Sequence, residues 1–238
     1  MKPIDVVMVT WQREAIANLC LKSLYGNTKT PFRLIVIDNG SDPEFVKQRL
    51  FPVADVYVKL DKNIGLEAAK HLGMDFVESE WFVSTDNDIL VPKKELFKTG
   101  DWLSNLVDLI TRYPEYASIA LRPQILVGTG DIFGDNPPEV REFSHVPGYM
   151  RLMETKLTNQ LGAWSDKREL RGHEEYWISE RIIKAGRKCG WASHIPCYHL
   201  FGNDGNWGYG SSLSPQQHGH NPTWLPQDDL EIIRRDYV

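Results

Sequence analysis

The chain has 238 residues, of which 42% are hydrophobic and 25% charged, and its formal net charge is −5. This composition is ordinary for a globular protein and argues against a disordered or fibrous chain. The acidic balance, without a basic stripe, argues against a nucleic-acid-binding protein. Three cysteines without a CxxC pair provide no disulfide framework, which is typical of a reducing compartment.

Membrane insertion is not expected, because no run approaches about 18 apolar residues. The opening residues, MKPIDVVMVTW, are followed at once by polar side chains and are typical of a strand rather than a signal peptide. We therefore expect a cytoplasmic protein without a transmembrane segment. Peripheral contact with a membrane surface is compatible with this expectation.

The first 126 residues alternate short apolar runs with amphipathic segments. The predicted strands are 4–10, 32–38, 55–60, 81–85 and 118–126. The predicted helices are 14–25, 42–50, 65–77 and 102–113. Strands that alternate with helices indicate βαβ units, so the pattern predicts an α/β fold with a mostly parallel central sheet flanked by helices.

The second half of the chain has a different character. Residues 127–147 are rich in Gly, Asp and Pro, and the helix predicted at 173–186 ends at a glycine, a common helix terminator. Residues 202–221 contain five glycines, and we expect this segment to close over a ligand, with Trp207 and Tyr209 stacking on it. We interpret residues 1–238 as one domain, with a ligand-binding half (1–126) and a smaller C-terminal region (127–238).

Polar side chains follow each predicted strand of the first half. They include Asp38 and Asn39, then Asn63 and Gly65, then Asp86, Asn87 and Asp88. In open α/β sheets, ligands bind beyond the carboxyl ends of the strands. Carboxylates gathered there repel each other unless a cation neutralises them. Mg²⁺ or Mn²⁺, which prefer carboxylate and phosphate oxygens, together with a diphosphate would do so.

The segments VVMVTWQRE, LKSLYGNT, LIVIDNGSD, NIGLEAAKHLGM and VSTDND resemble, in this order, the motifs of the family-two glycosyltransferases of the GT-A fold. The resemblance covers residues 4–90 closely and 148–201 more loosely. It implies an inverting transferase of the hexosyltransferase type that uses Mn²⁺ or Mg²⁺. It would move a sugar from a nucleotide-diphosphate donor, a UDP-sugar, to a hydroxyl of a saccharide or other acceptor.

The same resemblance implies roles for individual positions on the donor side. The positions bordering the nucleotide base would be Thr10, Arg13 and Glu14. Those near the nucleotide and diphosphate would be Asn63, Gly65 and Lys70. The Asp-x-Asp segment, which binds donor and metal, would be Asp86, Asn87 and Asp88. Asp38 would accept a hydrogen bond from the uracil imide, and Asp88 would be the more direct metal ligand.

The second half would supply the base and a further metal ligand. In RGHEEYWISERIIKAG, Glu175 stands where the family has the acid that deprotonates the acceptor hydroxyl. Consecutive helical residues point about 100° apart, so at most one of Glu174 and Glu175 should face that hydroxyl, and Glu174 stays open as a rival. His199, in CYHLFG, would complete the metal site.

Three alternative functions make different demands on the sequence. A nucleotidyltransferase that makes nucleotide sugars would open with a glycine-rich phosphate loop, but VTWQREAIANL contains no glycine. A response-regulator-like domain needs only about 120 residues and has no use for Glu175 or His199. A catalytically inactive relative that binds sugar nucleotides keeps the same motifs, and donor hydrolysis distinguishes it from an enzyme.

Overall fold

The computed structural model of the chain describes residues 2–12, 14–43, 54–123, 136–146, 148, 150–164, 174–200 and 234–237. For Glu14, Ala15 and Glu174 it describes the backbone alone. Most of the helix predicted at 42–50, and all of the glycine-rich segment 202–221, lie outside these residues.

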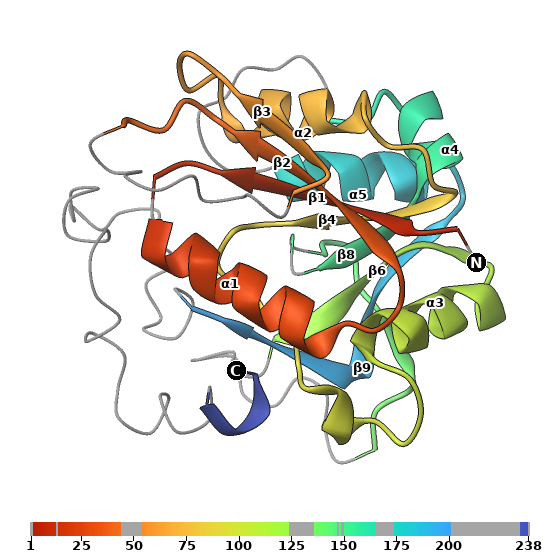
Figure 1. Cartoon of the computed structure of the whole chain (residues 1–238). Helices are drawn as coiled ribbons and strands as arrows, with labels where there is room; N and C mark the ends of the chain where they lie inside the picture. The colour runs from red at the N-terminus through yellow and green to blue at the C-terminus, as the bar shows by residue number, and fades with distance from the viewer. Residues whose placement is uncertain are drawn as a thin grey trace.

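Strands and helices alternate through the first half of the chain, as predicted (Figure 1). The strands are β1 (Ile4–Thr10), β2 (Phe32–Asp38), β3 (Val56–Lys59), β4 (Trp81–Thr85), β5 (Ile89–Leu90), β6 (Tyr116–Pro123), β7 (Val140–Glu142), β8 (Arg151–Glu154) and β9 (Lys188–His199). The helices are α1 (Glu14–Asn27), α2 (Leu66–Met74), the 3-10 turn η1 (Lys94–Leu96), α3 (Trp102–Arg112), α4 (Thr155–Gln160) and α5 (Glu174–Lys184).

The strands form one mixed sheet in the order β3-β2-β1-β4-β8-β6-β9-β5, and β7 pairs with β9. β1, β2, β3 and β4 are parallel neighbours, which confirms the predicted parallel sheet, while β6, the fifth predicted strand of the first half, pairs with β8 and β9. Strands of the second half extend it: β8 lies antiparallel between β4 and β6, and β9 runs parallel to β6. Both halves of the chain therefore share one sheet.

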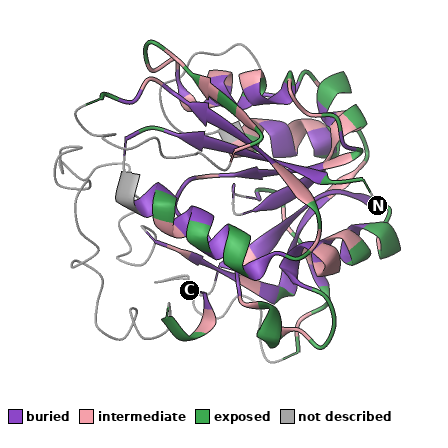
Figure 2. Cartoon of the chain, in the orientation of Figure 1, coloured by how far each residue is buried: buried purple, intermediate pink, exposed green. Residues whose placement is uncertain are grey.

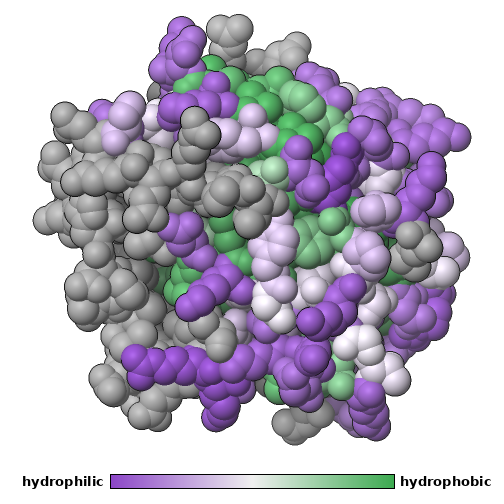
Figure 3. Space-filling model, in the orientation of Figure 1, coloured by the Kyte–Doolittle hydropathy of each residue, from purple (hydrophilic) through white to green (hydrophobic). Residues whose placement is uncertain are grey.

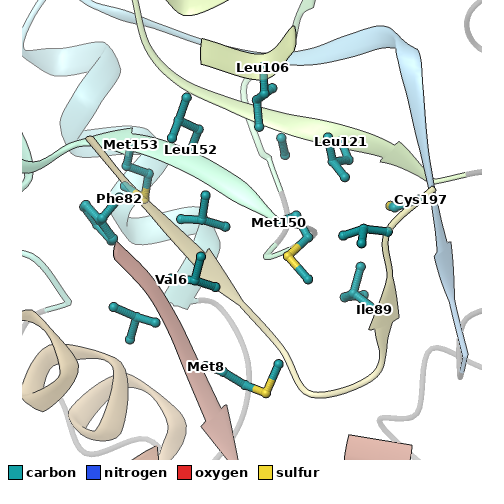
Figure 4. Packing of buried hydrophobic residues seen from close by; sticks show 14 of the residues in the cluster. Val6, Met8, Phe82, Ile89, Leu106, Leu121, Met150, Leu152, Met153 and Cys197 are labelled. Carbon is teal, nitrogen blue, oxygen red and sulfur yellow. The ribbon is translucent and has the colours of Figure 1, made fainter. Parts of the chain in front are cut away.

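Helices cover both faces of this sheet, with α2, α4 and α5 on one side and α1 and α3 on the other (Figure 1). Figure 2 shows that the central strands are buried almost throughout, while exposed residues follow the outer sides of the helices. β1 is buried along its whole length, as a strand covered on both faces should be. Within the core, Val6, Phe82 and Leu152 come from three adjacent strands (Figure 4).

Several element boundaries differ from the prediction. α2 ends at Met74, three residues before the predicted end, because the chain turns there through hydrogen bonds to the carbonyls of Leu72, Gly73 and Met74. β6 starts two residues earlier than predicted, at Tyr116. α5 covers 174–184, and Gly186 follows with a φ of 77°, the left-handed conformation that favours glycine after a helix.

On the face shown in Figure 3, a central band of hydrophobic residues lies between hydrophilic groups. Among the described residues, no helix is both long and apolar enough to cross a membrane.

Candidate active site

The carboxyl ends of the first strands meet at one edge of the sheet, as predicted. Thr10 at the end of β1 is level with Asp38 at the end of β2. Asn87, which follows β4, donates a hydrogen bond from its Nδ2 to Thr10 Oγ1 at 2.9 Å. The first and fourth strand ends are thereby joined by a hydrogen bond between two buried side chains.

Asp38 is completely buried, and three donors surround its carboxylate. The backbone N–H of Ser41 donates to Oδ1 at 2.8 Å. Tyr57 Oη and Lys59 Nζ both donate to Oδ2, at 2.9 and 3.1 Å. A carboxylate has about four acceptor sites, so one remains for the predicted bond from a nucleotide base.

The loop between β3 and α2 is held by side-chain amides. Asn39 Nδ2 donates to Asn63 Oδ1 at 3.0 Å, and Asn63 Oδ1 also accepts from the backbone N–H of Gly65 at 2.8 Å. Gly40 has a φ of 76°, and a Cβ there would lie 2.2 Å from the carbonyl carbon of Lys62. Only glycine allows the two loops to approach this closely.

Asp88 and His199 are brought together by the pairing of β5 with β9. Ile89 is level with His199 in this antiparallel pair, and the backbone N–H of Leu200 donates to the Asp88 carbonyl at 2.9 Å. His199 Nε2 consequently lies 3.5 Å from Asp88 Oδ1. Although 111 residues separate them in sequence, the two predicted metal ligands are neighbours.

The other predicted groups meet around Lys70 on α2. Its Nζ lies 3.3 Å from Asp86 Oδ1 and donates to Glu175 Oε1. Gly148 leaves the space for this meeting, since a Cβ there would lie 2.8 Å from Glu175 Oε1 and 3.1 Å from Asp86 Oδ2. The predicted base therefore lies beside the Asp-x-Asp segment, although it comes from the second half of the chain.

Burial and neighbouring charges act differently on the two acids that share Lys70. Burial raises the pKa of Asp86, and although Lys70 lowers it, the carboxylates of Asp88 and Glu175 add to the increase. Burial also pushes the pKa of Glu175 upward, but Lys70 and Arg151 outweigh it and hold that pKa below its usual range. The site therefore favours the ionised form of Glu175 more than that of Asp86.

The charges and donor atoms at this edge are compatible with a divalent cation. Three carboxylates (Asp86, Asp88 and Glu175) face two permanent cations (Lys70 and Arg151), which leaves one negative charge while His199 is neutral. Asp88 and His199 offer an oxygen and a nitrogen that suit Mn²⁺. No group of three His, Cys, Asp or Glu ligands is assembled within the described ranges. A cation here would thus take further ligands from the donor, as Mg²⁺ sites commonly do.

Several predicted residues cannot be placed. Arg13, Trp207 and Tyr209 lie outside the described residues. The side chains of Glu14 and Glu174 are likewise outside the description, although both residues begin helices. Their roles stay predictions, and Glu174 remains the rival of Glu175.

Three residues of the site were missed by the sequence analysis. Arg151 donates from Nη1 to Glu175 Oε2 at 3.0 Å, and its signal was a charged residue inside the apolar run MRLM. Tyr57 and Lys59 are two residues apart on β3, so both side chains lie on the face toward Asp38. This spacing of two was the signal in the sequence that could have found them. None of the three belongs to the motifs on which the family resemblance rests.

Comparisons with solved structures show the same fold in several proteins, one of them a mannosyltransferase. GalNAc-T7, solved with UDP, GalNAc and Mn²⁺, has a TM-score of 0.65 and 17% identity over 90% of this chain and 46% of its own. TarS residues 1–349 of S. aureus give 0.62 and 15% over 83% and 60%. The mannosyltransferase PcManGT of Pyrobaculum calidifontis, solved with GDP-Man and Mn²⁺, gives 0.64 and 18% over 82% and 56%.

The chain thus spans only 46–60% of the length of these proteins. A search of curated protein sequences finds no significant match. The model of glycosyl transferase family 2 matches residues 5–165, which is more than half of the chain and contains all the donor-side motifs. With the GT-A arrangement of sheet and strand ends described above, this match shows that the chain belongs to glycosyl transferase family 2.

Proposed function

We propose that the chain transfers a hexose from a UDP-sugar to an acceptor hydroxyl with inversion, and that Glu175 is the base. The observation that supports this most is the meeting of Glu175 with Lys70 and Asp86. It places an ionised carboxylate from the second half beside the Asp-x-Asp segment of the first. A base must lie within hydrogen-bond reach of the proton that it removes, and this edge is where a donor sugar would lie.

On the donor side, Asp38 would accept from the uracil imide with its remaining acceptor site. Gln12 supports a ligand at the same edge, because its Oε1 is buried and has no hydrogen-bond partner in the described chain. Leaving such an atom unpaired costs about 1–3 kcal/mol, which a donor N–H or hydroxyl would offset. Gln12 also has a φ of 56°, a conformation that non-glycine residues seldom adopt.

Lys70 would bind the diphosphate through its ammonium group, which is a compact point charge. A cation held by Asp88, His199 and the donor phosphates would stabilise the negative charge of the leaving nucleotide diphosphate. Asp86 lies between the Asp88–His199 pair and Lys70. Its carboxylate would therefore be shared by the two positive groups that contact the donor, the metal ion and Lys70.

On the acceptor side, Glu175 would take the proton of the acceptor hydroxyl at one of its carboxylate oxygens. Each oxygen accepts one bond from a cation in the structure. Each can accept another, so the hydroxyl can bind without displacing Lys70 or Arg151. The acceptor would be a saccharide or another compound with a free hydroxyl.

The experiment is a screen of UDP-, GDP- and dTDP-sugars with Mn²⁺, in which release of the nucleotide diphosphate is measured with and without acceptors. We expect turnover of a UDP-hexose that chelator abolishes. Asp88→Ala should abolish it too, while Asp108→Ala, which removes an exposed acid on α3, should not. Full activity in excess chelator would contradict the metal. No turnover of any donor, despite binding, would indicate an inactive relative.

A further inference from the structure

A buried arginine lies directly behind the proposed base. Arg151, the first residue of β8, has a side chain with 0% exposure, and its Nη1 donates to Glu175 Oε2 at 3.0 Å. The same nitrogen donates to the carbonyl of Val146 at 3.0 Å. The guanidinium is therefore enclosed by protein on the side away from the donor edge.

Every N–H of this guanidinium has a partner. Nε donates to Ser118 Oγ on β6, and Nη2 donates to Ser179 Oγ at 3.1 Å and to Cys189 Sγ at 3.6 Å. A guanidinium has five N–H donors, and all five are used within the protein. Arg151 has no spare donor for a substrate, so we expect any effect on the reaction to act through Glu175.

The bond to Ser179 ties the first turns of α5 to the sheet. Ser179 Oγ donates to the carbonyl of Glu175 at 2.6 Å while it accepts from Arg151. Arg151 thus holds Glu175 at two points, directly at the carboxylate and through Ser179 at the backbone. Two attachments of this kind restrict both the position and the rotation of the carboxylate.

Stability alone does not account for this arrangement. Replacing a buried ion pair by apolar residues of similar volume is often neutral or stabilising. A pair of this kind fits a site where the charge of Glu175 must be held in one place.

Lys70 and Arg151 differ in how firmly they hold Glu175. Lys70 divides its charge between Glu175 and Asp86 and sits on a flexible stem. Arg151 has a planar fork that is fixed on β6, β8, β9 and α5 at once. Lys70 also contacts Asp86 of the Asp-x-Asp segment, so a donor phosphate bound there would compete with Glu175 for its ammonium group, whereas the described partners of Arg151 lie away from that segment.

We propose that Arg151 is a positioning residue, which holds the Glu175 carboxylate toward the acceptor and keeps it paired when Lys70 turns to the donor diphosphate. This inference rests on the proposed function, because it assigns to Glu175 the role of the base. It adds a residue outside the family motifs to the machinery of the transfer.

The test compares Arg151→Gln and Arg151→Lys with Arg187→Gln as a matched control. Arg187 also forms a 3.0 Å ion pair with a glutamate of the sheet, Glu154, and donates to the carbonyls of Pro114 and Tyr116. Its partner Glu154 is the last residue of β8, at the opposite end of the strand from Arg151. The loss of Arg187 should lower stability without changing transfer.

For Arg151→Gln we expect kcat to fall about 10²-fold, the loss that a displacement of about 1 Å can cause. The donor KM and the donor Kd from calorimetry should stay near wild type, since Arg151 touches no donor group. Arg151→Lys retains the charge but loses the planar guanidinium fork, so its kcat should lie between those of the wild type and Arg151→Gln. In a Glu175→Gln background, Arg151→Gln should add no further loss.

An unchanged kcat, a loss confined to the donor KM, or losses that add fully in the double variant would each overturn the inference. Where Arg151→Gln does not fold, Arg151→Lys carries the test, and wild-type kcat in that variant would likewise overturn it. A wild-type protein that transfers no sugar refutes the proposed function itself. An active wild type with an unaffected Arg151→Gln refutes the positioning role alone.

Discussion

Asp38 and Glu175 are both enclosed carboxylates at the same edge of the sheet, but their partners come from different distances along the chain. The donors to Asp38 are Ser41, Tyr57 and Lys59, which are 3, 19 and 21 residues away. The donors to Glu175 are Arg151 and Lys70, which are 24 and 105 residues away. One acid belongs to a local unit, and the other joins the two halves of the chain.

On the proposed roles of the two acids, this difference separates binding of the donor from the chemistry of the transfer. The surroundings of Asp38 are complete once β1, β2 and β3 have paired, because all its partners lie on or beside those strands. Those of Glu175 form only when α5 and β8 have packed against the first half. Contacts of high sequence separation carry a larger loop-closure cost. We therefore expect the surroundings of Glu175 to be more sensitive to mutation than those of Asp38.

The largest effect should follow from removing the charge of the base. Glu175→Gln retains the size of the side chain and removes its basicity, so transfer should fall by about 10²–10⁴. Affinity for the UDP-sugar should stay nearly unchanged. Initial rates and calorimetry of the same preparations measure the two effects separately.

Glu180→Gln is the matched control for this change, because Glu180 lies on the same helix and pairs with Lys184 at 2.9 Å on the outer surface. It should transfer sugar like the wild type. If Glu174→Gln lowers the rate and Glu175→Gln does not, the base is one residue earlier. If neither lowers it, single-base inversion is wrong.

A third carboxylate, Asp101, sharpens the comparison because most of its hydrogen-bond donors are backbone N–H groups. It caps α3 by accepting from the N–H of Ser104, and it also accepts from the backbone N–H groups of Lys29 and Thr30. Asp101→Asn should destabilise the protein by roughly 1–3 kcal/mol, because asparagine can still cap α3 with its oxygen but its NH₂ group cannot accept the bonds from Lys29 and Thr30, which are left unpaired. Denaturant unfolding at neutral pH measures this loss.

The same variant gives a pH signature. Burial pushes the pKa of Asp101 upward, but hydrogen bonds from Ser104, Thr30 and Lys29 outweigh it and lower that pKa below its usual 3.8. A lowered folded-state pKa stabilises the protein above the unfolded value, and this stabilisation is lost as the pH falls through the folded value. The gap between wild type and Asp101→Asn should therefore narrow below about pH 4. A gap that is constant down to pH 2 would contradict this explanation.

Crowding the meeting point of the two halves should have a smaller effect on the rate. A Cβ at Gly148 would lie 2.8 Å from Glu175 Oε1 and 3.2 Å from Lys70 Nζ. We expect Gly148→Ala to displace these groups and lower kcat about 10–10²-fold. Steady-state kinetics with the active donor provides the measurement.

Gly26→Ala is its control, because nothing lies within 4 Å of a Cβ at that position in α1. Alanine is the better helix former, so this control should gain up to about 1 kcal/mol of stability and keep its activity. Wild-type kcat in Gly148→Ala would show that the Lys70–Glu175 contact is not needed for transfer.

The comparison also explains what the sequence could predict. The parallel strands of the first half and the residues at their ends follow from local apolar runs and turn residues, and Thr10, Asp38 and Asn87 lie where predicted. The antiparallel insertion of β8 between β4 and β6 leaves no local pattern, since the pairing joins residues about 70 apart along the chain. Arg151, on that strand, was missed for the same reason. His199 lies beside Asp88, but only the family resemblance suggested it as a metal ligand, and that role stays a prediction.

The smallest effect should come from the local side of the comparison. Tyr57 Oη donates to Asp38 Oδ2 at 2.9 Å, but Tyr57 is 43% exposed, and Asp38 keeps its bonds from Ser41 and Lys59 when this one is lost. Tyr57→Phe should therefore cost about 1 kcal/mol of stability, because water can replace part of a half-exposed bond. UDP affinity should stay within about threefold of wild type, and UDP should still bind more tightly than GDP or CDP, because the imide needs only one acceptor site on Asp38. Calorimetry with the three nucleotides in Mn²⁺ measures this. A loss of tenfold or more for UDP would show that Tyr57 contacts the nucleotide itself, and tighter binding of GDP in the wild type would refute the assignment of Asp38 to uracil.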